Sequence, residues 1–342
     1  MPLGPQNIDL AASLAELRKG HLPLRARLRL AEEAGPHKKL FTSDLTVNEF
    51  LLTEESGVEP ISQVMGSSIY HIGRIGDYKG KTGEIEGISQ AHREARRMAL
   101  YRLWQEASLV GADCVIAVRL KERLITKGAH GKGGDDGDEV IEFTAVGTAA
   151  RVPWLEEMGV QRGNPIVTDL SGQDFWALTR EGYVPCGLVF DFCRYHVWHV
   201  LGQQQGWSFQ QFGEVAQASS GIEMARHLVA DRVTRKAREL GATMVVGSDI
   251  TFRVHEVPCG WPGCHLNDLD IDVAWFATAI RRAKNFERKQ DADVPPLILG
   301  MMKLGRAKKD EFVDEEDDQK ELEEQAREEE ERAVEKDDEG EE

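Results

Sequence analysis

The sequence predicts an α+β protein of two tandem domains, each a two-layer sandwich in which one long helix covers a small sheet. Two observations predict this fold class. One stretch of the chain occurs twice, as residues 42–152 and 167–282. Within each copy, apolar residues follow a strand pattern, then a helical pattern, and then two further strand patterns that suit a β-hairpin.

The duplication rests on two ungapped alignments. "SDLTVNEFLLTEESGVEPISQVMGSSIYH", residues 43–71, matches "TDLSGQDFWALTREGYVPCGLVFDFCRYH", residues 168–196, at a constant offset of 125. "EARRMALYRLWQEASLVGADCVIAV" matches "MARHLVADRVTRKARELGATMVVGS" at an offset of 130, which holds to the closing "GTAAR" and "ATAIR". Self-similarity at fixed offsets indicates one repeated structural unit.

The first element of each copy is a short apolar, β-rich run, at residues 58–65 and 183–190, which predicts a strand. A polar, glycine-rich segment follows in both copies. The last two elements predict the hairpin: "DCVIAVRL" with "VIEFTAVGTAA" in the first copy, and "TMVVGSDITFRV" with "DIDVAWFATAI" in the second.

Between these strands each copy predicts a long helix. In the first copy Ser89 suits the N-cap and Gly111 the C′ position; Ser220 and Gly241 repeat them in the second. The apolar stripe recurs at helical spacing. It comprises Ala95, Met98, Ala99, Leu103, Ala107 and Val110, and then Ile222, Ala225, Val229, Val233, Ala237 and Leu240.

Together these motifs resemble the YbjQ family, the so-called heavy-metal-binding domain, in two tandem copies. The resemblance rests on the "TSDL" opening, the Gly-x-x-Pro strand, the Tyr-His pair after it, the helix ending "VGADCVIAV" or "LGATMVVGS", and the closing motifs. It implies small domains that assemble into pentameric rings, and it implies little chemistry. We therefore expect a pentamer-based ring homo-oligomer whose partner is the chain itself.

The repeated pairs Tyr70-His71 and Tyr195-His196 are the best candidates for a shared feature. Histidine can ligate a metal or transfer protons near neutral pH. The favoured interpretation is a hydrogen-bonded contact between domains or subunits at a strand end.

The second copy adds Cys193 and His199 to His196, at spacings of three. Such a set could hold a soft divalent ion if the segment is helical or tightly turned. On an extended strand, this spacing alternates between the faces and separates the ligands.

The stretch "HEVPCGWPGCH" gathers Cys259, Cys264, His265 and His255 at the predicted tip of the second hairpin. Zinc suits such nitrogen and sulfur ligands, so zinc is the one cofactor that the sequence suggests. A disulfide or redox pair and an ordinary loop are the alternatives, and the ordinary loop is favoured. The first copy has no cysteine at the corresponding tip.

The charge and composition exclude several classes. The net charge is −17, but residues 310–342 carry 20 Asp and Glu against 4 Lys and Arg, so the body is nearly neutral. No basic cluster suits nucleic acid. No apolar run reaches the roughly 18–20 residues of a membrane span, and the start lacks the features of a signal peptide. With an odd count of five cysteines, we expect a cytoplasmic protein.

The segments outside the copies have their own patterns. Residues 1–41 predict two short helices broken at Gly20 and Pro23, and residues 153–166 predict a linker. Residues 283–309 form an apolar and basic connector, and residues 310–342 an acidic disordered tail. Residues 295–309 or the tail are the expected sites for a protein partner.

The sequence contains no Gly-x-Ser-x-Gly, P-loop lysine or His-Glu-x-x-His motif, so no residue has an assigned role in a reaction. We expect a non-enzymatic assembly or binding protein. Two alternatives stay open: a metal-binding protein that uses the cysteines and histidines of the second domain, and an unrecognised enzyme with a pocket between subunits.

Overall fold

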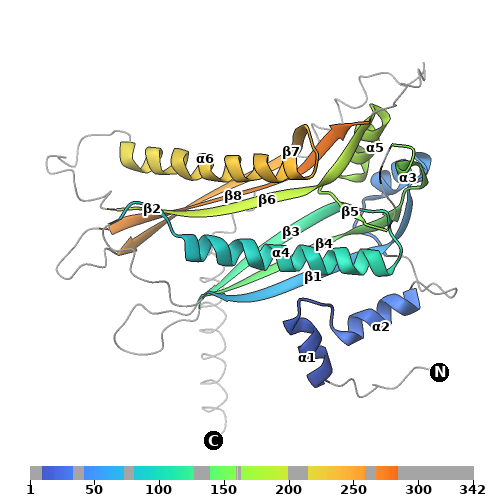
Figure 1. Ribbon diagram of the computed structural model, residues 1–342, viewed down its shortest axis with the longest axis horizontal. Helices are drawn as coiled ribbons and strands as arrows, with labels where there is room; N and C mark the ends of the chain where they lie inside the picture. Colours follow the sequence, from blue (N-terminus) through green and yellow to red (C-terminus); the bar gives the residue numbers. More distant parts are fainter. Residues whose placement is uncertain are drawn as a thin grey trace, which may run out of the picture. The chain divides into compact units, whose positions relative to one another are not determined.

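The computed structural model describes residues 10–33, 42–72, 81–126, 139–158, 160, 163–198, 215–258 and 267–283. The chain divides into two compact units, Met1–Arg288 and Lys289–Glu342, and the second lies wholly outside the described residues. The acidic tail and residues 295–309 are therefore not described. Both repeated domains belong to the first unit (Figure 1).

Each domain has the predicted order of strand, long helix and hairpin, which confirms the α+β class. The first domain contains α3 (Val47–Glu55), β1 (Glu59–Ile72), β2 (Gly83–Glu84), α4 (Glu86–Leu109), β3 (Cys114–Thr126) and β4 (Glu139–Arg151). The second contains β5 (Ile166–Val167), α5 (Gly172–Arg180), β6 (Tyr183–Val197), α6 (Ala216–Glu239), β7 (Met244–Pro258) and β8 (Asn267–Arg282).

The predicted first strands were too short. β1 and β6 continue to Ile72 and Val197, so both Tyr-His pairs lie within strands. The short helices α3 and α5 were not predicted, although their N-cap residues Thr46 and Ser171 are visible in the sequence.

The prediction of Ser89 and Ser220 as helix N-caps was wrong. The helices begin earlier, with Ile85 and Val215 as their N-cap residues, and neither cap makes a side-chain hydrogen bond. Ser89 is buried inside α4 instead. The C′ glycines were predicted correctly, since Gly111 and Gly241 both have φ of 72°.

Two sheets form, and each includes a short strand from the other domain. The first sheet has the strand order β1-β4-β3-β5, and the second sheet has β2-β6-β8-β7. The main strands are antiparallel, whereas β5, at the start of the second domain, pairs in parallel with β3. β2, from the first domain, pairs with β6. The domains are therefore joined through their backbones.

The long helices occupy different positions (Figure 1). α4 packs on β1 and β4 of the first sheet and also contacts β6 of the second sheet. α6 packs on the opposite face of the second sheet, against β6 and β8. The prediction that each helix covers one sheet is thus incomplete, because α4 lies between two sheets.

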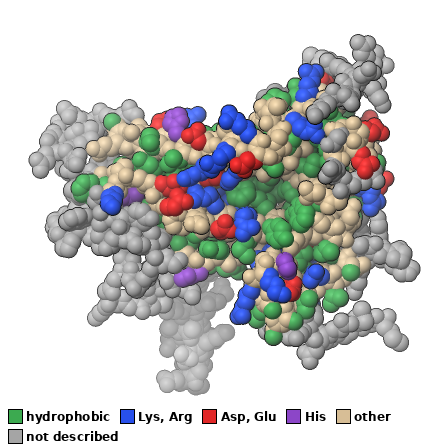
Figure 2. All heavy atoms as spheres, in the orientation of Figure 1, with side chains coloured by type: hydrophobic (Ala, Val, Ile, Leu, Met, Phe, Trp, Pro, Cys, Tyr) green, Lys and Arg blue, Asp and Glu red, His purple; other side chains and the backbone are tan. Residues whose placement is uncertain are grey.

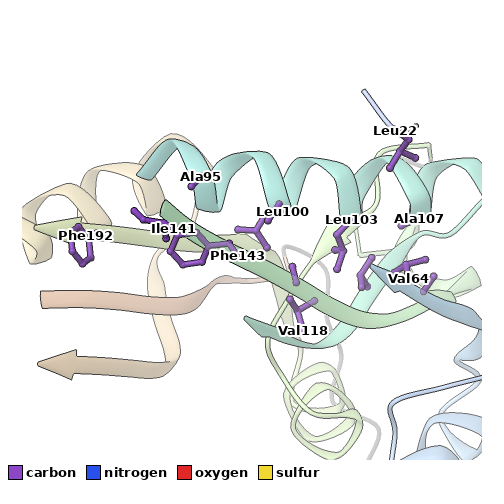
Figure 3. Packing of buried hydrophobic residues seen from close by; sticks show 14 of the residues in the cluster. Leu22, Val64, Ala95, Leu100, Leu103, Ala107, Val118, Ile141, Phe143 and Phe192 are labelled. Atoms are coloured by element: carbon purple, nitrogen blue, oxygen red, sulfur yellow. The ribbon is translucent and has the colours of Figure 1, made fainter. Parts of the chain in front are cut away.

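Most residues of the predicted helical stripes lie in the cores, whereas Leu240, at the end of the second stripe, is 45% exposed. Ala95, Ala99, Leu103 and Ala107 are fully buried in one cluster, and Ala225, Val229, Val233 and Ala237 are buried in another. Figure 3 shows Phe192 of β6 beside Ile141 and Phe143, under α4. A third cluster joins the domains; it includes Cys114 and Ile116 of β3 with Leu170 and Phe175.

The "TSDL" and closing motifs meet in both domains. In the first, Ser43 Oγ lies 3.1 Å from Thr148 Oγ1, which also accepts from the Asp44 N–H. In the second, Thr168 Oγ1 lies 2.8 Å from Thr278 Oγ1, which accepts from the Asp169 N–H. The repeated residues therefore make the same contact.

The segments outside the domains are partly ordered. α1 (Leu10–Arg18) and α2 (Leu24–Glu33) lie on either side of Gly20 and Pro23, as predicted, and α2 contacts α4. The predicted linker includes the 3-10 helix η1 (Pro153–Leu155), and Leu155 is buried. Among the described residues, no helix is both long and apolar enough to cross a membrane.

Candidate functional site

The contact between α4 and the second sheet is the most elaborate polar and aromatic arrangement of the described residues. The ring of His92 on α4 stacks on Phe192 of β6, with centroids 3.8 Å apart and planes 7° from parallel. The guanidinium of Arg96 lies 4.9 Å from the Phe143 ring and 5.2 Å from the Phe192 ring. One layer of side chains thus joins both sheets to α4.

Glu122 of β3 neutralises this layer. Its carboxylate accepts a 2.6 Å hydrogen bond from Arg96 and lies 3.3 Å from His92 Nδ1. Burial would raise the pKa of Glu122, but His92 and Arg96 lower it to about 2. Burial also lowers the pKa of His92, although Glu122 acts in the opposite direction.

The backbone of β6 receives a segment of the first domain along its edge. The Ile85 N–H donates to the Arg194 carbonyl at 2.8 Å, and the Arg194 N–H donates to Ser89 Oγ at 3.0 Å. Just before this segment, Gly83 and Glu84 pair with the Tyr195-His196 pair. The second Tyr-His pair therefore lies beside a segment of the other domain.

A charged strip follows the same edge between α4 and α6 (Figure 2). Arg232 donates two hydrogen bonds to Glu84, and Lys236 lies 2.7 Å from Asp191. Arg93 reaches Glu84 at 3.3 Å. Burial would raise the pKa of Glu84, but the hydrogen bonds from Arg232 outweigh it and lower that pKa. The Glu84 carboxylate is thus the centre of this strip.

A second buried ionic group lies on the face of the second sheet. Arg194 holds Asp272 with two hydrogen bonds of 2.6 and 2.7 Å, and His255 Nε2 lies 3.0 Å from the same carboxylate. Burial would raise the pKa of Asp272, but these two partners hold that pKa well below its usual range. Because His255 is engaged here, its imidazole has a structural partner.

The two histidines of the repeated pairs have different surroundings. His196 is buried, with Nδ1 2.7 Å from Asp270 and Nε2 3.5 Å from Asp268. The hydrogen bond with Asp270, opposed by burial, raises the pKa of His196. His71 is exposed and Tyr70 half-buried on β1. The two pairs lie at equivalent positions near the ends of β1 and β6, but His196 is buried beside two aspartates whereas His71 is exposed.

The predicted set of Cys193, His196 and His199 is not brought together on β6. Cys193 is in the core beneath α6, and three residues along an extended strand place His196 on the opposite face. Burial raises the pKa of the Cys193 thiol, which opposes thiolate formation. His199 lies outside the described residues.

The other predicted metal ligands, Cys259, Cys264 and His265, also lie outside the described residues, and His255 is on β7. Within the described ranges, no group of three or more His, Cys, Asp or Glu side chains is placed to hold a metal ion.

The two long helices differ in burial at equivalent positions. Ser89, His92 and Arg96 of α4 are buried against the second sheet. At an offset of 130 their equivalents in α6 are Ser219, Ile222 and Arg226, of which Arg226 is exposed and the others half-buried. Domain two therefore presents a helix face whose counterpart in domain one is covered.

The outward face of the first sheet is the matching surface. In the second sheet, Phe190 and Arg194 of β6 lie against α4. At an offset of 125 their equivalents on β1 are Met65, which is 49% exposed, and Ile69, which is 70% exposed. Apolar side chains therefore occupy this open face of the first sheet.

A third difference lies at the starts of β3 and β7. Cys114, Ile116 and Ala117 are buried where the second domain begins. Their equivalents at the start of β7 include Met244, which is 41% exposed, and Gly247, which is exposed. In this third comparison, as in the first two, one domain buries side chains whose equivalents in the other domain are more exposed.

Sequence reasoning missed this pattern because repeats with similar motifs suggest similar burial. One signal was present in the sequence of β1. Met65 and Ile69 lie on one face of this strand and Val64 and Ile72 on the other, so both faces carry hydrophobic side chains. Such a strand is covered on both sides more often than a half-exposed one.

Comparison with known proteins gives the chain's relatives. The family model described as putative heavy-metal-binding, YbjQ, matches residues 62–153. An encapsulin nanocompartment protein of Mycobacterium tuberculosis is 37% identical over 273 residues, which cover 78% of this chain and 95% of the relative. A UPF0145 protein of Thermotoga maritima is 33% identical over 116 residues, 33% of this chain and 96% of the relative. No solved structure matches the chain.

Proposed function

The chain belongs to the YbjQ family of putative heavy-metal-binding proteins, and we propose that it is a non-enzymatic protein that assembles head to tail with copies of itself. The contact between chains repeats the contact between the two domains. The outward face of α6 in one copy packs on the outward face of the first sheet in the next, as α4 packs on the second sheet.

One observation carries the proposal: at equivalent positions, domain one is covered by domain two, whereas no described residue covers domain two in the same way. Met65 and Ile69 lie where Phe190 and Arg194 meet α4. A contact between two different surfaces of the same chain is heterologous, so it leaves one unpaired surface at each end of any open oligomer.

A heterologous contact either closes into a ring or propagates as a filament. We propose a closed ring based on five subunits, the number that the family resemblance implies, and a cytoplasmic location. The name of the Mycobacterium tuberculosis relative, an encapsulin nanocompartment protein, supports a role in a larger assembly.

The test compares two methionines of equal exposure. Met65 is 49% exposed and belongs to the proposed contact, whereas Met224 is 48% exposed and its equivalent, Glu94 on α4, is not among the residues buried by the second sheet. We expect Met65→Glu to weaken association by roughly 10- to 100-fold, the loss from placing a charge where about 1.5–3 kcal/mol of apolar burial is made. Met224→Glu should leave association unchanged.

The readout is light scattering coupled to size-exclusion chromatography at micromolar concentration. A wild-type mass near five times 38.2 kDa supports the ring. A single wild-type species of 38.2 kDa would overturn the assembly, and equal behaviour of the two variants would place the contact elsewhere.

A further inference from the structure

Side chains from both long helices meet at the backbone edge of β6. Arg93 of α4 donates to the Phe192 carbonyl at 3.2 Å and lies 3.7 Å from the Asp191 carboxylate. Arg232 of α6 also lies 3.7 Å from Asp191, and both guanidiniums contact Glu84. Two carboxylates therefore hold two arginines at one strand edge, one arginine from each face of the second sheet.

The edge of β1 is the equivalent position in the first sheet, and its charges are different. At an offset of 125, Ser67 is the equivalent of Phe192 and Gly66 the equivalent of Asp191, so one bridging carboxylate is missing. At an offset of 130, Arg102 of α4 is the counterpart of the α6 arginine, and one of its terminal nitrogens donates to the Ser67 carbonyl. Arg102 thus occupies the carbonyl whose equivalent on β6 is bound by the helix of the other domain.

The charge of Arg102 is poorly compensated within the described part of the chain. Its Nε is buried there without a hydrogen-bond partner. Burial lowers the pKa of Arg102, whereas hydrogen bonds to Glu84 raise the pKa of Arg232. Since a partly buried guanidinium is stabilised by an opposite charge, an acidic side chain is the partner that this edge favours.

The helix that the proposed assembly places on this edge supplies such a side chain. α4 and α6 each have 24 residues and are equivalent at an offset of 130 along their whole length. Glu223 of α6 stands at the position of Arg93, and its side chain is 58% exposed. It lies 3.5 Å from Arg226 and 3.9 Å from His227 in its own helix. Such exposed pairs contribute little, so Glu223 can exchange them for another cation.

We propose that Glu223 of one copy pairs with Arg102 of the next copy, beside the Ser67 carbonyl. This inference rests on the proposed head-to-tail assembly, in which α6 lies on the first sheet as α4 lies on the second. Inside the chain, Arg93 meets an acidic edge; between copies, Glu223 meets a basic one. The helix and the edge change sign together, so the charges are complementary in both contacts.

The pair also selects the sheet on which α6 docks. At the edge of the second sheet, Glu223 would face the like charges of Asp191 and Glu84. At the edge of the first sheet, Arg93 would face Arg102 without the carboxylate that Asp191 provides. Repulsion therefore disfavours an exchange in which α6 of one copy takes the place of α4 in another.

A charge exchange in the full-length protein tests the pair. Glu223→Arg and Arg102→Glu alone should each weaken subunit association by about 10-fold or more, because each brings like charges together. The double variant restores an opposite pair and should recover most of this loss. Asp231→Arg is the matched control and should leave association unchanged. Asp231 is an exposed carboxylate of the same helix, and its equivalent on α4, Tyr101, is 40% exposed beside the second sheet's contact.

A neutral variant and a salt titration keep the test valid if Arg102→Glu folds poorly. Glu223→Gln changes an exposed side chain of α6, so it should keep the wild-type circular dichroism spectrum and associate more weakly. Because salt screens an ion pair, raising the NaCl concentration from about 0.05 M to about 0.5 M should weaken wild-type association more than that of Glu223→Gln. Light scattering over a dilution series measures both.

The outcomes separate this inference from the assembly itself. An oligomeric wild type, with association unchanged in Glu223→Arg and equally salt-dependent in Glu223→Gln, would overturn the pair and leave the assembly standing. A monomeric wild type would overturn both. Weaker association in the single variants, recovery in the double variant and no effect of Asp231→Arg would support the pair.

Discussion

Asp169 has a different electrostatic environment from its equivalent in the first domain. In the first domain its equivalent, Asp44, lies 3.4 Å from Arg119. In the second domain the equivalent of Arg119 is Asp249, so a like charge replaces the ion pair. Burial, with a further contribution from Asp249, raises the pKa of Asp169 to about 6.

This shift predicts a pH dependence of stability. The folded-state pKa lies above the ordinary aspartate value of 3.8, so between these values the folded state binds more protons and stability falls as pH rises through this window. We expect Asp169→Asn to stabilise the protein by about 1–3 kcal/mol at pH 8 and to flatten the dependence between pH 4 and 7. Denaturant unfolding at several pH values measures both.

The matched control is Asp44→Asn, which removes a partner of Arg119. It should be neutral or cost up to about 1 kcal/mol, as expected for a partly exposed ion pair. If both variants stabilise equally at pH 8, burial and like charge at Asp169 are not the cause.

Gly66 fixes how closely α4 approaches β1. A Cβ atom at this position would lie 2.0 Å from the Ala99 carbonyl oxygen and 2.4 Å from the Leu103 nitrogen, both on the α4 backbone. We expect Gly66→Ala to destabilise the fold by about 2–3 kcal/mol or more, because the helix must move away. Gly87→Ala, at an open site on the same helix, should be neutral or gain up to about 1 kcal/mol. Equal effects in thermal unfolding would contradict this close approach.

At the scale of elements, the spacing of apolar residues predicted the strand, helix and hairpin of each domain, and the glycines at the helix ends were predicted correctly. They could not predict β2 and β5, because these two-residue strands exist only through pairing with the other domain. Ser89 shows the same limit, since its cap-like sequence position was overruled by the Ile85 contact with the Arg194 carbonyl. For the candidate site, the repeated motifs drew attention to Tyr195 and His196. The exposed faces of α6 and β1 could be found only by comparing the burial of equivalent residues in the two domains.

A zinc site at Cys259 and Cys264, in the segment between β7 and β8, remains a hypothesis. If it holds zinc, protein purified without added metal should contain about one zinc per chain, and Cys259→Ser should lose it. Elemental analysis measures this directly. Less than about 0.2 zinc per chain, unchanged in Cys259→Ser, would remove the hypothesis. Replacing the tip with residues 129–135 of the first domain should leave folding and assembly intact, because the ends of β7 and β8 pair without it.

At the scale of the whole molecule, the chain is an incomplete repeat. Domain one has its helix α4 and the start of β3 covered by domain two, whereas the equivalent surfaces of domain two are more exposed among the described residues. A second copy is the partner that we propose for these surfaces, since the chain already contains one instance of the contact. The proposed association is heterologous, because it joins two different surfaces of the same chain.

The most direct measurement is a cryo-EM reconstruction of the purified assembly. It should show α6 of each subunit lying on the outward face of the next subunit's first sheet, with Met65 and Ile69 buried. An assembly built through other surfaces, with Met65 and Ile69 still open to solvent, would contradict the repeated contact.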